Sequence, residues 1–411
     1  MALNYIWIGF FLISFAVALI KFIFSGDTEI FKLIVEGMFD SAKVAVMDIA
    51  LPLAGVMTFF LGLLNIGEKA GAINFLARII GPFFHQLFPE VPKNHPANGQ
   101  MIMNFSANML GLDNAATPFG LRAMQSLQDL NPTKETASNA QIMFLVLHTS
   151  GLTIIPLGVM AQRSILGAQD PSDILIPCLI ATYIATVASI IITGFWQRIN
   201  LFNRIFIGWI GSITAILGLL LWYLSSQTKE QLEIISKVGG NLILLIIVVA
   251  FLLGGLRKKI DLFGTFVDGA KAGFETSVKI IPYLVGMLVA ISTFRNAGVM
   301  NYLVEGLKYL IALTGMNTDF SDSLPVALMR PISGSASRAL MIDSMKQFGA
   351  DSFVGRLSCM FQSSADTTFY IVALYFGSVG IKKTRYAIVA GLIADFIGVT
   401  AAILLAYLFF H

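Results

Sequence analysis

Two polar segments interrupt an otherwise apolar chain, and both carry side chains that could bind a solute. In the first, residues 104–120, Asn104 and Asn108 are four positions apart, which places both amides on one face of a helix. The second, residues 330–338, carries three hydroxyl side chains, namely those of Ser333, Ser335 and Ser337. Amides and hydroxyls both donate and accept hydrogen bonds, so this composition indicates a site for a polar solute.

Both segments have the signals of a helix that breaks and then restarts. Gly111 weakens the first helix, Asp113 and Asn114 follow, and Thr117-Pro118 is typical of an N-cap followed by a first-turn proline. Unwound backbone at membrane depth is tolerated only when it is buried in protein or lines a wet cavity. Two restarting helices would aim two positive N-termini at one central site, which suits a polar or anionic solute. The alternative is that both segments are extramembrane turns, but their recurrence at matching places favours the binding site.

A second pair of polar interruptions supplies candidates for ion coupling. One runs from His148 to Thr153, and the other surrounds Asp366 with Gln362, Ser363, Ser364, Thr367 and Thr368. An isolated charge at bilayer depth costs about 3 kcal/mol, so Asp366 is expected to be buried against a partner or a cavity and to exchange a proton. The alternatives are a purely structural carboxylate at Asp366 and a histidine at 148 that donates to a neighbouring carbonyl.

Composition places the protein in a membrane and excludes several functions. The 411 residues are 56% hydrophobic and only 12% charged, about half the charged fraction of a soluble domain. The formal net charge of +3 is too small for nucleic-acid binding through phosphate neutralisation. Cys178 and Cys359 lie apart in apolar runs, so we predict neither a metal site nor a cofactor. Sequence motifs of proteases and phosphotransferases are missing, and we expect no enzymatic activity.

Apolar runs predict an all-α polytopic membrane protein with roughly nine spanning helices. Three further segments mix charges with apolar residues at helical spacing, and we expect them to be separate helices in the interface: 27–43, 72–87 and 261–279. The predicted spans are 4–24, 47–64, 142–160, 174–195, 205–224, 238–256, 280–294, 353–376 and 386–410.

The chain also matches itself at about half its length. Val35-Glu36-Gly37 returns as Val267-Asp268-Gly269, Pro52 returns as Pro282, and Gly71 returns as Gly298. Basic clusters near the predicted spans indicate their cytoplasmic ends, and they place the two halves in opposite orientations, with Met1 cytoplasmic and His411 external. We therefore predict inverted repeats with broken or re-entrant helices, over residues 1–200 and 231–411, joined by a linking helix in 201–230.

The polar segments carry a resemblance to a known family. Residues 108–120 resemble the signature stretch of spore maturation protein A, and residues 330–343, 362–370 and 377–383 are similar to spore maturation protein B. The chain thus looks like a fusion of the two. The resemblance implies the nucleoside-recognition, or gate, domain group, whose inverted repeats also occur in concentrative nucleoside transporters and ferrous iron transporter B. It also implies a bacterial inner membrane.

These observations favour a transporter of a small polar organic solute, nucleoside-like or amino-acid-like, with a midplane site between the repeats. Its expected partners are the lipid bilayer, the solute and a coupling proton or sodium ion. The sequence does not decide whether the protein forms a homo-oligomer. The alternative functions are a non-transporting scaffold or regulator of envelope or spore maturation, and an ion or water pathway.

Overall fold

The computed structural model describes residues 2–110, 113–201, 203–227, 229–313, 315 and 317–411. The described chain is helical, as the sequence predicts, and its strand-like pairing is limited there to one parallel bridge between Thr136 and Lys383. Gly111, which the sequence predicts to weaken a helix, lies outside the described residues.

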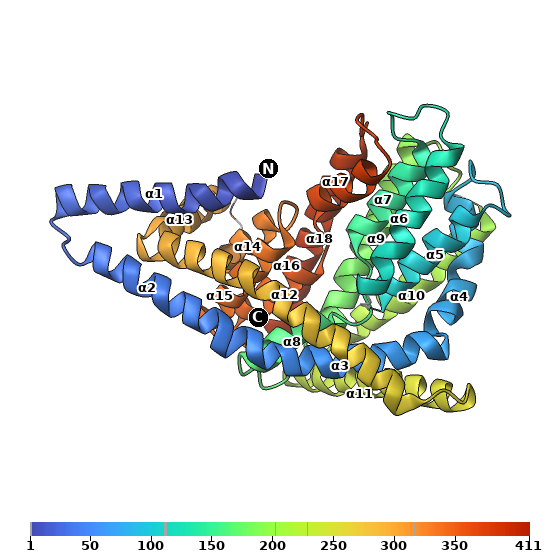
Figure 1. Cartoon of the computed structure of the whole chain (residues 1–411), viewed down its shortest axis with the longest axis horizontal. Coiled ribbons are helices and arrows are strands. Elements are labelled where there is room, and N and C mark those ends of the chain that lie inside the picture. Colours follow the sequence, from blue (N-terminus) through green and yellow to red (C-terminus); the bar gives the residue numbers. More distant parts are fainter. Residues whose placement is uncertain (1, 111–112, 202, 228, 314, 316) are drawn as a thin grey trace. The chain divides into compact units, whose positions relative to one another are not determined.

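The helices of the two halves follow the same order along the chain (Figure 1). The first half comprises α1 (Ala2–Ser25), α2 (Ile30–Val44), the π-helix η1 (Ala45–Ala50), α3 (Leu51–Ala70), α4 (Ala72–Leu87), α5 (Pro96–Met109), α6 (Asp113–Leu130), α7 (Asn139–Ser150), α8 (Leu157–Ile165) and α9 (Leu175–Trp196). The helix α10 (Arg204–Ser225) follows. The second half comprises α11 (Lys229–Arg257), α12 (Leu262–Asn296), α13 (Val299–Ala312), the 3₁₀-helix η2 (Asp319–Ser323), α14 (Leu324–Met329), α15 (Gly334–Phe348), α16 (Phe353–Ser363), α17 (Thr368–Ser378) and α18 (Ala387–Phe410).

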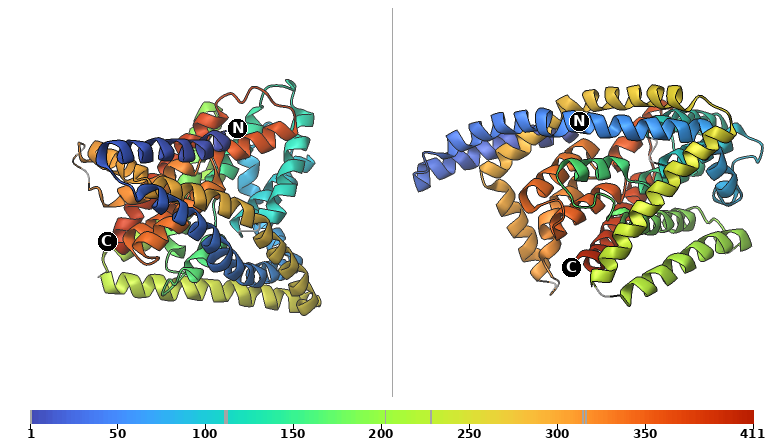
Figure 2. Two further views of the ribbon diagram at one scale, coloured as in Figure 1. Left: turned by 60° about the vertical axis from the view of Figure 1, so that its left-hand side comes forward. Right: turned by 90° about the horizontal axis from the view of Figure 1, so that it is seen from below.

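Each half contains one long helix, and a glycine that recurs in the repeat follows each of them. The first runs for 41 residues through α2, η1 and α3, and the second is the 35-residue α12. Figure 2 shows both as continuous helices, in blue and in yellow to gold. A left-handed glycine follows each helix within two residues, Gly71 with φ +95° and Gly298 with φ +87°, a conformation that glycine adopts without a steric penalty. A shorter helix then starts in each half.

The sequence prediction of separate interfacial helices at 27–43 and 261–279 is wrong. Both segments continue into the apolar run that follows, past Pro52 and Pro282. In the first half the π-helix η1 lies directly before Pro52, and an extra residue in a turn relieves the clash between a proline ring and the preceding turn. Neither boundary carries a cap that would end the helix.

The repeated glycines Gly37 and Gly269 mark two equivalent helix crossings. A Cβ atom on Gly269 would lie 2.5 Å from the carbonyl oxygen of Leu61, and one on Gly37 would overlap Nδ2 of Asn296. An asparagine amide bridges each crossing. Asn65 donates to the carbonyl of Thr265 at 2.7 Å, and Asn296 donates to the carbonyl of Leu33 at 3.2 Å. The acceptor precedes the glycine by four residues in both cases, so the internal repeat extends to individual contacts.

Substituting Gly269 by alanine is expected to lower the melting temperature of the micelle-solubilised protein. The new methyl group would press on the backbone of α3, and overpacking of this kind costs about 1–3 kcal/mol, which exceeds the helix-propensity gain of about 1 kcal/mol. The control is Gly306→Ala on α13, where nothing lies within 4 Å of the added Cβ, and we expect that change to stabilise. Stabilisation by both alanines would show that the crossing at Gly269 is loose.

Two of the predicted spans, 142–160 and 353–376, are each two helices. The first breaks between α7 and α8 over residues 151–156, and the second breaks between α16 and α17 over residues 364–367. Among the described residues, five helices are long and apolar enough to cross a membrane, and two shorter apolar helices lie in α11 and α12. The protein is therefore a polytopic helical membrane protein, while the count of nine spans stays a prediction.

The described chain forms two compact units, and both are discontinuous in sequence. The first unit comprises Met1–Phe60, Gly158–Pro171 and Ala270–Gln362, and the second comprises Leu61–Leu157, Ser172–Gly269 and Ser363–His411. The first unit thus combines α13–α16 of the second half with α8 of the first half. The second unit combines α4–α7 of the first half with α17 of the second half, and α17 contacts α6, α7 and α18. The helix after the break in each half thus lies in the unit that holds helices of the other half: α8 lies with α13–α16, and α17 lies with α4–α7. We call this the exchange of α8 and α17. The domain boundaries at 200 and 231 remain predictions.

A charged contact anchors each exchanged helix inside its unit. Lys382, just after α17, binds Glu135 in the α6–α7 loop at 2.6 Å, and both side chains are more than 60% exposed. Arg163, on α8, binds Asp351 in the α15–α16 loop at 3.0 Å, and its side chain is fully buried. The guanidinium also donates to the carbonyls of Ala350 at 2.6 Å and Asp170 at 3.1 Å. The two contacts are equivalent in topology but differ in burial.

Candidate functional site

Three polar side chains, from α5 and from the segment before α17, meet around the imidazole of His148 in the second unit. Nδ1 of His148 lies 2.8 Å from Nδ2 of Asn108 and 3.1 Å from Oδ1 of Asn104. Nε2 lies 3.8 Å from Oδ2 of Asp366. The histidine side chain is 5% exposed and that of Asp366 is 40% exposed. We call these four residues the His148 cluster.

The amide pair of the cluster comes from one helix face. The helix α5 starts with Pro96 at its first position and His95 as its N-cap, an arrangement that suits a helix start because proline has no N–H to lose there. Asn104 and Asn108 are one turn apart on α5 and contact the same ring nitrogen of His148. Their four-residue spacing in the sequence accounts for this arrangement.

Two helix breaks lie side by side and bring Asp366 to His148. The helix α7 ends at Gly151, whose φ of +59° is left-handed. The N–H of Asp366 donates to the carbonyl of Thr149 at 2.7 Å. The last carbonyls of a helix lack partners within that helix, so the break before α17 satisfies one at the end of α7. Oδ1 of Asp366 also accepts from the N–H of Thr367 at 2.6 Å.

The cluster can satisfy either protonation state of His148. Asn104 donates to the carbonyl of Ala116 at 2.7 Å, which turns its oxygen toward the ring. Asn108 offers a donor to a bare Nδ1, whereas Asn104 offers an acceptor to a protonated Nδ1. A neutral ring can therefore accept from Asn108, and an imidazolium can donate to Asn104 while Nε2–H faces Asp366. The alternative that His148 merely donates to a backbone carbonyl does not match these contacts.

Tyr375 belongs to the surroundings of the cluster and was not predicted from the sequence. Its ring centroid is 5.0 Å from that of His148, edge to face, and Nδ2 of Asn104 lies 3.5 Å from its hydroxyl. A Cβ atom on Gly120 of α6 would overlap the same hydroxyl. A bulkier residue at position 120 would therefore displace the phenol. Tyr375 lies within the apolar run that becomes α17, and nothing in that run indicates a contact with His148 or Asn104.

The serines of the second predicted segment start and anchor α15 in the first unit. Ser333 accepts from the N–H of Ala336 at 3.2 Å and is the N-cap of α15. Its hydroxyl lies 3.2 Å from that of Ser335, and Ser337 donates to the carbonyl of Val326 at 3.0 Å. Nε2 of Gln362 donates to the carbonyl of Gly334 at 3.4 Å, while its buried Oε1 has no partner among the described residues.

The remaining predicted residues lie near these two groups. Thr368, at the start of α17, donates to Oδ2 of the buried Asp395 on α18 at 2.7 Å, so that helix-borne carboxylate is paired through a hydroxyl. Ser364 and Thr367 are buried, and Ser363 and Thr117 are partly buried. Asp113 and Asn114 belong to the first turn of α6, but their side chains lie outside the described part of the structure.

The structure thus brings the predicted residues together in two groups. Ser333, Ser335, Ser337 and Gln362 belong to the first unit. The second unit holds Asn104, Asn108, Thr117, His148, Ser363, Ser364, Asp366, Thr367 and Thr368. The convergence of both groups on one cavity stays a prediction. Asp366 is more exposed than the sequence suggested, since 40% of its side chain is accessible.

Comparison with known proteins adds a family and two relatives. The family model for the Gate domain, described as nucleoside recognition, matches residues 50–165 and 277–382, together just over half of the chain. Spore maturation protein B of Bacillus subtilis is 45% identical over 165 residues, which are 40% of this chain and 91% of that protein. Spore maturation protein A of the same bacterium is 40% identical over 161 residues, 39% of this chain and 82% of that protein. Both matches are consistent with a fusion. No solved structure matches the chain significantly.

Proposed function

This chain belongs to the nucleoside-recognition Gate family, and from that membership we propose that it transports a small polar organic solute across a bacterial inner membrane. The solute class is nucleoside-like or amino-acid-like. The role proposed is translocation without chemical change, with a proton or a sodium ion as the coupling species.

The observation that supports transport is the pairing of two helix breaks around the His148 cluster. Broken helices leave backbone donors and acceptors without helical partners, and such backbone is tolerated at membrane depth only in protein or next to water. In the second unit the breaks after α7 and before α17 lie against each other, with two amides, an imidazole and a carboxylate beside them. Paired breaks with ionisable groups are the usual construction of solute and ion sites in inverted-repeat transporters.

The coupling proposal follows from the two hydrogen-bond states of His148. A group that carries a proton during transport must be stable both with and without it. Asn104 and Asn108 meet this requirement at Nδ1, and the half-exposed Asp366 can balance the charge at Nε2. A change of charge at this place would alter the contact between the two breaks.

The direct test is uptake into vesicles reconstituted with the full-length protein. Radiolabelled nucleosides and amino acids are offered with a pH gradient, with a sodium gradient and with neither, and empty vesicles give the background. Gradient-dependent accumulation of one class supports the proposal. If every solute enters at the background rate under all three conditions, a scaffold or regulatory role in envelope or spore maturation becomes the better explanation.

Reporter fusions test the proposed orientation of the chain. Basic residues near span ends are retained in the cytoplasm, and the clusters at Arg257–Lys259 and Lys382–Arg385 indicate those ends. We expect a reporter placed after Lys259 to be cytoplasmic and one placed at His411 to be external, with Met1 cytoplasmic. Detection of both reporters on the same side would remove the inverted orientation of the halves.

A further inference from the structure

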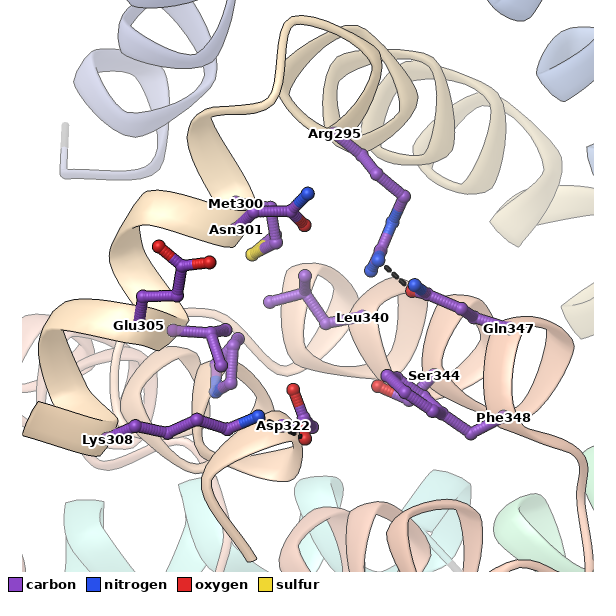
Figure 3. A pocket seen from close by; sticks show the side chains of 12 residues that line it. Arg295, Met300, Asn301, Glu305, Lys308, Asp322, Leu340, Ser344, Gln347 and Phe348 are labelled. Carbon is purple, nitrogen blue, oxygen red and sulfur yellow. Dashed lines mark hydrogen bonds and ion pairs between the residues drawn. The ribbon is translucent and has the colours of Figure 1, made fainter. Parts of the chain in front are cut away.

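A cavity in the first unit lies among α12, α13, η2, α14 and α15, and its lining includes no residue of the His148 cluster (Figure 3). Its volume is about 200 Å³, below the roughly 300–1,000 Å³ of sites that hold drug-sized ligands. Apolar side chains, among them Met300, Val304 and Leu340, form part of its lining. The cavity therefore suits a solute of few non-hydrogen atoms.

One wall of the cavity carries a guanidinium with an unused donor. Arg295, at the end of α12, donates to Gln347 and to Asp343, and Figure 3 shows its side chain reaching toward Gln347. Its Nε is buried and has no acceptor among the described residues. Leaving a buried donor without an acceptor costs about 1–3 kcal/mol, so an acceptor oxygen from a bound molecule would be stabilising here.

A second wall carries a carboxylate without a counter-charge. Glu305, on α13, is an exposed residue of the cavity lining and makes no hydrogen bond or ion pair with another described residue. Lys308 and Asp322, which also line the cavity, neutralise each other at 2.9 Å. The Glu305 carboxylate is thus the charge within this lining that the described chain leaves uncompensated, and it would attract a cation.

A buried hydroxyl completes the polar lining. Ser344, on α15, is 5% exposed and lines the cavity. Serine inside a helix usually bonds to the carbonyl four residues earlier or to water. A buried hydroxyl in a cavity wall can donate to or accept from a bound molecule.

We propose that this cavity binds a small zwitterion of the α-amino-acid class. Its carboxylate would accept from Arg295 and Ser344, and its ammonium would lie against Glu305. A simple cation would leave Nε of Arg295 without an acceptor, and a simple anion would meet the charge of Glu305. A molecule that carries both charges can interact with Arg295 on one wall and with Glu305 on the other. This site is independent of the transport function proposed above, because it uses none of the same residues.

The test is calorimetric titration of the full-length protein in micelles with L-alanine and with its two singly charged counterparts, propionate and ethylammonium. We expect L-alanine to bind at least about tenfold more tightly than either one. Equal affinity for propionate or for ethylammonium would overturn the zwitterion assignment. Absence of L-alanine binding up to about 10 mM would overturn the site itself.

Two variants assign the binding to this cavity. Glu305→Gln should weaken L-alanine binding by at least about tenfold and should fold normally, because Glu305 makes no contact that its loss would break. The matched control is Glu275→Gln, which removes another exposed carboxylate of the first unit and should leave binding unchanged. Ser344→Ala should weaken binding as well. Unaltered binding in the Glu305→Gln protein would show that the solute binds elsewhere.

Discussion

Replacing Asp366 by asparagine is expected to leave the protein folded and to abolish the pH dependence of solute uptake. The amide oxygen can still accept from the N–H of Thr367, and the side chain is 40% exposed, so the fold loses little. The charge that faces Nε2 of His148 is removed, however, and an imidazolium there would have no balancing carboxylate. We therefore expect the ratio of uptake rates between about pH 6 and about pH 8 to fall to about 1.

The control for this prediction is Glu135→Gln. Glu135 is also an acidic partner of a basic residue in the second unit, but its contact with Lys382 is exposed and includes no residue of the His148 cluster. This variant should retain the pH dependence of the unmodified protein. Uptake by the Asp366→Asn protein with undiminished pH dependence would show that Asp366 is structural. His148→Gln gives a second measurement, since it removes the titrating ring itself.

Replacing Arg163 by methionine is expected to lower the free energy of unfolding by about 3 kcal/mol. The guanidinium is fully buried and donates to two carbonyls and to Asp351. Methionine fills much of the same space but donates nothing, so the acceptors lose a partner inside the protein. Chemical unfolding in micelles, followed by circular dichroism, measures the loss.

The equivalent contact of the other exchanged helix provides the comparison. Lys382→Gln removes the ion pair with Glu135, but both of its side chains are mostly exposed, and exposed pairs contribute about 0–1 kcal/mol. We expect a much smaller effect than at Arg163. Similar losses in the two variants would show that burial does not determine how strongly α8 is anchored.

The repeat in the sequence predicted much of the fold because its glycines have defined physical roles. Gly71 and Gly298 end the long helices with a left-handed conformation, and Gly37 and Gly269 allow close helix crossings. Each of these roles requires glycine at one position, so it can be recognised from the sequence. We predicted that the helices over 27–43 and 261–279 would be separate from the apolar runs that follow, and this prediction is wrong. Charged residues at helical spacing indicate an interfacial face, but they do not stop a helix. Stopping it requires a cap or a backbone break, and neither boundary has one.

The candidate site was predicted in its residue types but not in its pairing. The spacing of Asn104 and Asn108 is local information, and a lone Asp366 in an apolar run is conspicuous by its cost. The contact of Asp366 with His148 joins positions more than 200 residues apart, and no local pattern carries that information. Arg163 and Tyr375 were missed for the same reason. Each acquires its role only when α8 or α17 packs against the other half of the chain.

The exchange of α8 and α17 gives a reason for the two halves to share one polypeptide. Residues 1–200 on their own would lack the segment that supplies the N–H of Asp366 to α7, and residues 231–411 would lack Arg163. Were the halves separate chains, their association would depend on the supply of both, because subunit assembly follows mass action. A covalent link fixes their ratio at one to one and raises the effective concentration of each half for the other to the order of millimolar. Joining the two halves in one gene therefore favours the assembly of this fold.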